Sequence, residues 1–424
     1  MTKAFLRKCR IALISACILG TAIALACTDD WGPEYSTSNF TPEIFVANAY
    51  SPFFYSNQLA AGYLAMLDKD YAKAAARYQK AEAITPRDRQ PQEQRRLLKM
   101  LNTIAAAPTI DHALEEKLLP DLEWLITQQA TADIRLYTAM DWLKKTFAAK
   151  YKKTGDLVKA ECFVHESAFY KNNQNVEALK AFLSKPNKTA YEATCANLCE
   201  IKLPDIYAYQ AALLAMNDHV SEALAMISHA PKAAGDTLPG NPFNARINDC
   251  HDCDHAATQK IKYTTLSFLQ KLKELKDKIA AGTDVYTNAI LVGNAQYNCT
   301  HFGNARAFYE GAILGSGTGT PEYLDSAFRA PLTDMSTAMK YYTLAAGAAR
   351  TDEQRAKCQY LLAKCQRNQW YMNNFARTND WDFQGLAFTA FDGFKGLKKY
   401  PNTNYYKEVL RECGYFNTYI KKNP

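Results

Sequence analysis

The chain has 424 residues, of which 48% are hydrophobic and 22% are charged, with 18 glycines and 16 prolines. This balance is typical of a globular protein and excludes disordered, collagen-like and polytopic membrane chains. The formal net charge is +7, and the chain contains 12 cysteines. Part of both belongs to the N-terminal segment, so each is best judged after that segment is set aside.

Residues 1–26 have the three parts of a secretory signal peptide. Basic residues between positions 3 and 10 precede an uncharged apolar run from Ile11 to Ala26, which ends in Ala24-Leu25-Ala26. The run is shorter than the roughly 20 residues that cross a hydrocarbon core, so we expect cleavage; a retained anchor helix is the alternative. Removal of residues 1–26 leaves a net charge of about +3, too small to indicate nucleic-acid binding.

Cys27 follows directly, and Ala24-Leu25-Ala26-Cys27 resembles the signal of bacterial lipoproteins. The resemblance implies that the Cys27 thiol receives a diacylglycerol and becomes the mature N-terminus, anchored to a membrane. Lipoproteins without aspartate directly after the cysteine usually proceed to the outer membrane, and this chain has Thr28 there. Whether the protein would face the periplasm or the surface stays open, and plain secretion with a free Cys27 thiol is the alternative.

The rest of the chain predicts an all-α protein. Residues 27–56 form an aromatic-rich segment behind the lipid anchor, expected to pack irregularly on the first helices. From residue 57 onwards helix-forming residues are frequent, and apolar residues recur at intervals of three and four. Loops rich in proline and glycine divide this part into N-terminal repeats over 57–240 and C-terminal repeats over 241–424. We expect one curved array of antiparallel helix pairs.

Small and aromatic residues recur at fixed offsets along the helical part. In the first copy Gly62 lies twelve residues before Ala74, and Tyr78, Ala81 and Pro86 follow. This pattern resembles a tetratricopeptide repeat, which implies a solenoid of helix pairs in close contact at the small residues. An unrelated helical bundle with small residues at its contacts is the alternative. Three further copies carry the same offsets: Ala211…Ala223-x3-Ile227-x2-Ala230, Gly293…Ala305-x3-Tyr309-x2-Ala312 and Ser326…Ala338-x3-Tyr342-x2-Ala345.

The copies at Gly293 and Ser326 are about 33 residues apart, close to the family's period, so we expect them to be consecutive. A second resemblance lies near the C-terminus. Phe391, Phe394, Leu397 and Tyr400-Pro401-Asn402-Thr403-Asn404-Tyr405-Tyr406 are similar to the helix junctions of repeat-containing envelope lipoproteins, including assembly-platform lipoproteins of outer-membrane machinery.

The densest set of ligand-type side chains is Asp249-Cys250-His251-Asp252-Cys253-Asp254-His255. Cys250 and Cys253 are separated by two residues and could share a tetrahedral zinc ion, with His251 or His255 as a further ligand. A structural disulfide is the first expectation for these cysteines, ahead of helix capping by the carboxylates and of the zinc site. Redox chemistry of the thioredoxin kind is the last alternative.

Other cysteines lie apart from this run. Cys195 and Cys199 could contribute to its disulfides or to its metal site, and His301 could contribute to the metal site. Nine cysteines follow Cys27, and an odd number leaves at least one thiol free or paired between chains in an oxidising compartment. Cys358 and Cys365 are seven residues apart in a predicted helix, roughly 10 Å and too far for a disulfide, so we expect them on a buried face.

Two further groups of polar residues have less specific patterns. Tyr297, His301, Phe302 and Asn304 lie in a predicted turn between two repeat helices, where such residues are interhelical locks or part of a binding loop. The adjacent carboxylates of the 115–116 pair are expected on a solvated helix face. Neither group by itself identifies a reaction.

The sequence contains no nucleophile elbow, no phosphate-binding glycine loop and no zinc-protease helix motif. We therefore expect a non-enzymatic lipoprotein of the cell envelope, without a cofactor, that binds protein partners on a helical-repeat scaffold. One alternative is a surface glycan- or nutrient-binding lipoprotein that works with an outer-membrane transporter, which predicts exposed Trp and Tyr side chains in one pocket. Another is a metal-binding protein or enzyme with zinc at Cys250, Cys253 and His255.

Overall fold

A computed structural model describes residues 52–83, 89–128, 134–247, 259–374 and 392–423. All regular elements in these ranges are helices. The β-type hydrogen bonding in these ranges is limited to two isolated bridges, Thr237–Thr264 and Gly311–Gly315. The predicted all-α class is therefore confirmed for the described part of the chain. None of its helices is long and apolar enough to cross a membrane. The predicted signal peptide and Cys27 lie outside the described residues.

The chain divides into two compact units, and a short stretch between two parts of unit 1 belongs to unit 2. Unit 1 consists of Met1–Glu166 and Glu177–Glu200, and unit 2 consists of Ser167–Val176 and Ile201–Pro424. The main division thus falls near residue 200, earlier than the loop around residue 240 that the sequence suggested. That loop belongs within unit 2, because side chains of unit 2 bind its backbone, as described below.

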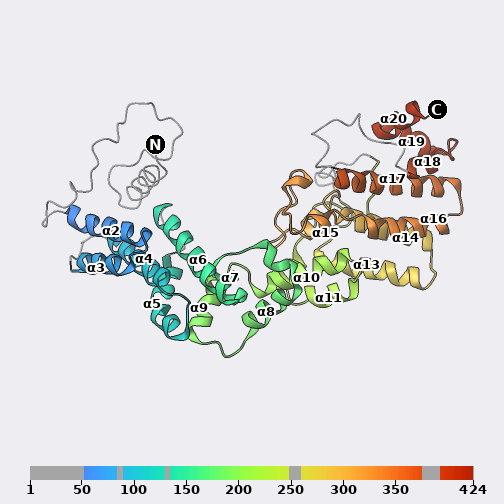
Figure 1. Ribbon diagram of the computed structural model, residues 1–424. Helices are drawn as coiled ribbons and strands as arrows, with labels where there is room; N and C mark the ends of the chain where they lie inside the picture. The colour runs from blue at the N-terminus through green and yellow to red at the C-terminus, as the bar shows by residue number, and fades with distance from the viewer. Residues whose placement is uncertain (1–51, 84–88, 129–133, 248–258, 375–391, 424) are drawn as a thin grey trace, which may run out of the picture. The chain divides into compact units, whose positions relative to one another are not determined.

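Unit 1 contains the helices drawn from blue to green in Figure 1. The longest is α6 with 21 residues, and the shortest is α7 with 7 residues. Their bounds are α2 (Pro52–Leu67), α3 (Tyr71–Glu82), α4 (Arg89–Ala106), α5 (His112–Gln128), α6 (Ile134–Thr154), α7 (Leu157–Phe163) and α9 (Ala190–Leu198). Helix α8 (Asn173–Ser184) begins in the stretch that belongs to unit 2 and ends in unit 1.

The first predicted repeat is a helical hairpin of α2 and α3. Asp70 caps α3 by accepting a hydrogen bond from the backbone N–H of Lys73 at 3.0 Å. Ala74, Tyr78 and Ala81 are all buried on one face of α3. A Cβ atom at Gly62 would lie 2.4 Å from the Tyr78 ring, so only glycine permits this approach of the two helices.

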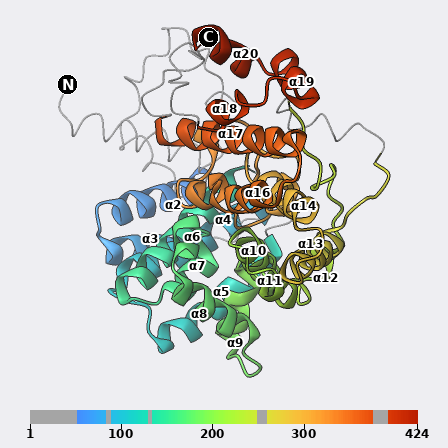
Figure 2. The same cartoon turned by 90° about the vertical axis from the view of Figure 1, so that its right-hand side faces the viewer.

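Unit 2 contains the remaining helices. Figure 2 shows α13, α14, α16 and α17 as successive layers, with α18 to α20 at the end of the stack. Their bounds are η3 (Ser167–Lys171), α10 (Leu203–Met216), α11 (Val220–Ile227), α12 (Pro231–Gly235), α13 (Thr265–Ala280), α14 (Val285–Asn298), η4 (Arg306–Phe308), η5 (Pro321–Tyr323), α15 (Arg329–Thr333), α16 (Ser336–Ala348), α17 (Asp352–Asn374), α18 (Asp392–Leu397), α19 (Asn404–Glu412) and α20 (Gly414–Lys422).

The two copies that were predicted to be consecutive repeats are in fact halves of one hairpin. Residues 299–335 separate α14 from α16 and contain only 3-10 turns and the five-residue α15, so Ala305, Tyr309 and Ala312 do not lie on a repeat helix. Gly293 on α14 instead contacts Tyr342 on α16, where an added Cβ would lie 2.6 Å from the ring. The prediction of two consecutive repeats was wrong because the offsets count residues along the chain, whereas packing depends on which helices are in contact.

The copy that begins at Ala211 is a helical hairpin of α10 and α11, in which Ala211, Ala223 and Ile227 are buried. Asp218, in its turn, has a positive φ of 71°. The Asp218 carboxylate accepts hydrogen bonds from Lys340 at 2.7 Å and from the Tyr341 hydroxyl at 2.8 Å. An ion pair with Lys276 at 2.8 Å joins the same carboxylate to α13. One side chain therefore connects three elements of unit 2.

The end of unit 2 contains two apolar clusters on opposite sides of α17. Cys358 and Cys365 are fully buried in the cluster between α17 and the α14/α16 hairpin, which confirms the predicted buried face. Phe394 and Phe416 belong to the other cluster, which joins α17 to α18 and α20. Full burial of side chains of this size contributes about 2 to 3 kcal/mol each.

Candidate functional site

Most of the predicted metal or disulfide site lies outside the described residues. This applies to the whole run from Asp249 to His255, and so to Cys250, His251, Cys253 and His255. Cys195 and Cys199 are described, and both are buried. Within the described ranges, no group of three or more His, Cys, Asp or Glu side chains could hold a metal ion.

The predicted binding loop is packed into unit 2. Tyr297, His301 and Asn304 are at most 7% exposed, and Phe302 packs against the cluster between α14 and α17. The Tyr297 hydroxyl accepts a hydrogen bond from Asn368 at 2.9 Å. These positions favour the interhelical role over contact with an outside ligand.

An asparagine network, Asn294, Asn298 and Asn304, surrounds this loop and binds the backbone of residues 241–244. Each amide is buried and donates to a carbonyl oxygen of that segment. Asn298 donates to Pro242 at 2.9 Å and to Asn244 at 2.7 Å, and it receives a bond from the Asn304 backbone N–H. The other two bonds are Asn294 to Phe243 at 2.8 Å and Asn304 to Asn241 at 3.1 Å.

The backbone that leads toward the Cys/His run is held at two further points, both on α17. Lys364 donates to the carbonyl oxygen of Arg246 at 2.8 Å, and the Tyr360 hydroxyl donates to the carbonyl oxygen of Ile247. The irregular segment 241–247 therefore has its carbonyl groups satisfied by side chains in place of a regular hydrogen-bond ladder. Side chains of α14 and α17 therefore hold the described backbone as far as Ile247.

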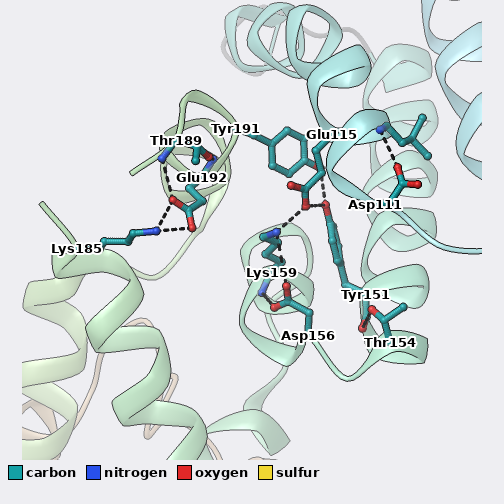
Figure 3. A network of polar contacts seen from close by, with 11 residues as sticks. Asp111, Glu115, Tyr151, Thr154, Asp156, Lys159, Lys185, Thr189, Tyr191 and Glu192 are labelled. Carbon is teal, nitrogen blue, oxygen red and sulfur yellow. Dashed lines mark hydrogen bonds and ion pairs between the residues drawn. The ribbon is translucent and has the colours of Figure 1, made fainter. Parts of the chain in front are cut away.

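Unit 1 contains a carboxylate–tyrosine network that sequence reasoning missed. It consists of Glu115 on α5, Tyr151 on α6, Lys159 on α7 and Tyr191 on α9, which converge in Figure 3. The Glu115 carboxylate accepts from Lys159 at 2.5 Å and from the Tyr151 hydroxyl at 3.0 Å. The Tyr151 and Tyr191 hydroxyl oxygens are 2.6 Å apart. Because the Tyr151 proton points to the carboxylate, Tyr191 is the donor in this second bond.

Burial and charge shift the pKa values of the two tyrosines and the lysine of this network. Burial, reinforced by the neighbouring Tyr191, raises the pKa of Tyr151, and burial likewise raises that of Tyr191, so both phenols stay neutral. Burial opposes the charge of Lys159, but the hydrogen bond and charge of Glu115 outweigh it and raise the lysine pKa. The ammonium also lies 5.5 Å from the Tyr151 ring and 5.8 Å from the Tyr191 ring, within cation–π range.

The network connects four helices, and its polar groups are directed at one another. A neutral phenol and a charged lysine are poor general bases, so this arrangement favours a structural role. The prediction that both carboxylates of the 115–116 pair are solvated is wrong for Glu115, which is 8% exposed, whereas Glu116 is exposed. Spacing could have shown this, because Leu118 and Leu122 follow Glu115 on the same buried face of α5.

Three buried thiols lie beside this network. Cys162 is on α7, Cys195 is on α9, and Cys199 is the residue at which α9 ends. Burial raises the pKa of the Cys195 thiol, and a hydrogen bond with Cys199 together with burial raises the pKa of the Cys162 thiol. Of this group, the sequence had singled out only the pair on α9.

The surface of unit 2 has a shallow groove of about 490 Å³ between α11 and α13. Its charged residues are largely paired along α13, for example Lys273 with Asp277 at 2.7 Å and Lys278 with Glu274 at 2.6 Å. The strongly exposed aromatic side chains of the described residues are Tyr137 in unit 1 and Tyr323 in unit 2.

Comparisons with protein families, with curated proteins and with solved structures give no match for this chain.

Proposed function

We propose that the protein is a non-enzymatic envelope lipoprotein whose helical hairpins form a tetratricopeptide-like scaffold for protein partners. The observation that carries this proposal is the recurrence of one close helix contact. Gly62 meets Tyr78 between α2 and α3, and Gly293 meets Tyr342 between α14 and α16. In both hairpins alanines four residues before and three residues after the tyrosine are buried, as the repeat pattern requires.

Repeated hairpins of this kind present helix faces and turns in series, which suits the binding of extended protein surfaces. The polar clusters of both units support the same proposal, because their groups bind other parts of this chain. A helix-based scaffold also accommodates an insertion such as residues 299–335 between its two helices without loss of the helix contact.

The N-terminal sequence supports export and anchoring. The basic residues, the apolar run to Ala26 and the following Cys27 are the features that lipoprotein processing requires. Acylation of Cys27 together with the modified N-terminus would supply enough acyl chains for stable anchoring. We therefore place the protein in a bacterial cell envelope, on the outer membrane.

Labelling of cells with a palmitate analogue tests the anchor. We expect label on the wild-type chain and none on Cys27→Ser, with Cys162→Ser as a control that keeps the label. An unlabelled wild-type chain that retains residues 1–26 would contradict export as a lipoprotein.

Photo-crosslinking in intact cells tests the scaffold. A crosslinking amino acid is placed at Tyr137 and at Tyr323, with exposed Glu116 as the matched control. We expect at least one of the two aromatic positions to yield a discrete protein adduct that Glu116 does not. Adducts that are absent at both positions, or identical at all three, would count against a protein partner on these surfaces.

A further inference from the structure

Helices α18 and α20 carry a surplus of positive charge. Residues 392–423 contain seven basic and three acidic side chains, a net charge of +4, whereas the sequence from residue 27 to residue 391 sums to about −1. Helix α19 is balanced, with two side chains of each sign. The surplus therefore lies on α18, on the turn that follows it, and on α20.

Packing brings the ends of α18 and α20 together. The Phe394 ring of α18 lies 5.5 Å from the Tyr419 ring of α20, measured between ring centroids. Lys398 donates a hydrogen bond to the carbonyl oxygen of Asn423 at 2.8 Å, so the turn after α18 lies beside the end of α20. Figure 2 shows both helices at the end of the stack. We define the basic face as the four exposed lysines around this junction, Lys395, Lys399, Lys421 and Lys422.

The charge of the basic face is not neutralised within the part of the chain that the structure describes. Lys395, Lys399 and Lys421 form no ion pair with another described residue. Helix α6 also carries a surplus of lysines, but it pairs Lys145 with Asp141 at 2.7 Å. The basic face therefore presents exposed ammonium groups that are available to a negatively charged partner.

The side chains of the basic face indicate what kind of partner fits. A lysine ammonium is a hydrated point charge on a flexible chain, whereas an anion held in fixed geometry is typically bound by arginine. The large apolar side chains of α18 and α20 are buried inside unit 2, and none of the strongly exposed ones of the described residues lies in 392–423. Exposed lysines without apolar neighbours fit a surface of diffuse negative charge.

We propose that the basic face binds the anionic phospholipid headgroups of a membrane surface, as a second contact in addition to the acyl anchor. The inference rests on the proposed anchoring, which keeps the chain close to a membrane. Each lysine near an anionic surface strengthens binding roughly fivefold, so the four lysines together contribute a factor of several hundred. Salt screens this attraction, because the Debye length falls from about 10 Å at 0.1 M to about 3 Å at 1 M.

Vesicle sedimentation tests the basic face without the acyl anchor. The mature chain with Cys27→Ser is mixed with vesicles of equal parts phosphatidylcholine and phosphatidylglycerol, or with vesicles of phosphatidylcholine alone. We expect binding to the anionic vesicles only, weakened at least about tenfold as salt rises from about 0.1 to about 1 M. Equal binding to both vesicles, or none to the anionic ones, would overturn the proposal. Binding to polyglutamate but not to vesicles would assign the face to an acidic protein and overturn it as well.

Two double variants separate the basic face from net charge. Lys399→Gln with Lys421→Gln removes two charges from the face and should weaken vesicle binding about 25-fold. Lys407→Gln with Arg411→Gln removes two charges from exposed positions of α19 and should weaken it less than about threefold. Circular dichroism and Tm show whether both variants stay folded. Equal losses in the two folded variants would overturn the assignment to α18 and α20.

Palmitate labelling separates this inference from the proposed function. A chain that binds anionic vesicles but takes up no palmitate in cells would refute the lipid anchor and leave the basic face intact. A labelled chain whose Cys27→Ser form does not bind anionic vesicles would refute the basic face alone.

Discussion

Each unit contains a buried network of polar side chains that joins several elements, and the two networks differ in their chemistry. In unit 1 the carboxylate–tyrosine network joins four helices through one ion pair and two phenols. In unit 2 the asparagine network joins α14 and the loop that follows it to an irregular segment through neutral amides. Side chains of neighbouring helices can be joined by an ion pair, whereas the buried carbonyl groups of an irregular segment require hydrogen-bond donors. The stability of unit 1 should therefore depend on whether its charges are paired, and the stability of unit 2 should depend on whether its hydrogen-bond donors are present.

The largest expected effect is in unit 2. Asn298→Leu removes the donor to Pro242 and to Asn244 and leaves both carbonyl groups unsatisfied in a buried site. At about 1 to 3 kcal/mol for each such group, the loss of local stability should be about 4 kcal/mol. Hydrogen exchange with mass spectrometry measures this for unit 2 separately. The exposed Asn402→Leu is the control and should change stability by less than about 0.5 kcal/mol. Protection unchanged in Asn298→Leu would contradict the importance of the asparagine network.

A smaller effect is expected in unit 1 when the ion pair is broken. Glu115→Ala leaves Lys159, which is 19% exposed, with only its longer ion pair to Asp156 at 3.7 Å, which should cost about 2 to 3 kcal/mol. Joint replacement, Glu115→Leu with Lys159→Met, should restore stability to within about 1 kcal/mol of wild type, because no uncompensated charge remains. Hydrogen exchange of unit 1 reports both variants, with Glu116→Ala as the exposed control. Losses that simply add in the double variant would show that packing, and not charge, dominates this junction.

The smallest effect is a dependence of unit 1 on pH. The His165 Nδ1 atom lies 2.8 Å from the buried Glu161 carboxylate, and this hydrogen bond raises the pKa of His165 above 6.5 despite partial burial. The contribution to stability is thus fully present below pH 6.5 and is lost as pH rises through the folded pKa. The difference in urea stability between wild type and His165→Gln should shrink as pH rises above about 6.5. A difference that is constant or grows with pH would contradict the pairing.

The all-α class, the two short-turn hairpins and the buried face of α17 could be predicted from local sequence. Helix propensity and the spacing of Gly62, Ala74 and Tyr78 act over a few turns, so the pattern in the chain is the pattern in the structure. The same signal was present for Glu115, since leucines at helical spacing follow it, and its burial could have been inferred. The hairpin of Gly293 with Tyr342 could not, because residues 299–335 intervene.

The sequence by itself determined the helices, the small and aromatic residues that let them pack closely, and the N-terminal signal that supports the proposed export. Only the tertiary structure decided which helices touch. It brought Glu115 to Tyr151 and Lys159, which come from other helices of the chain. Helical periodicity fixes which face of a helix is apolar, but the partner of that face depends on packing summed over the whole unit.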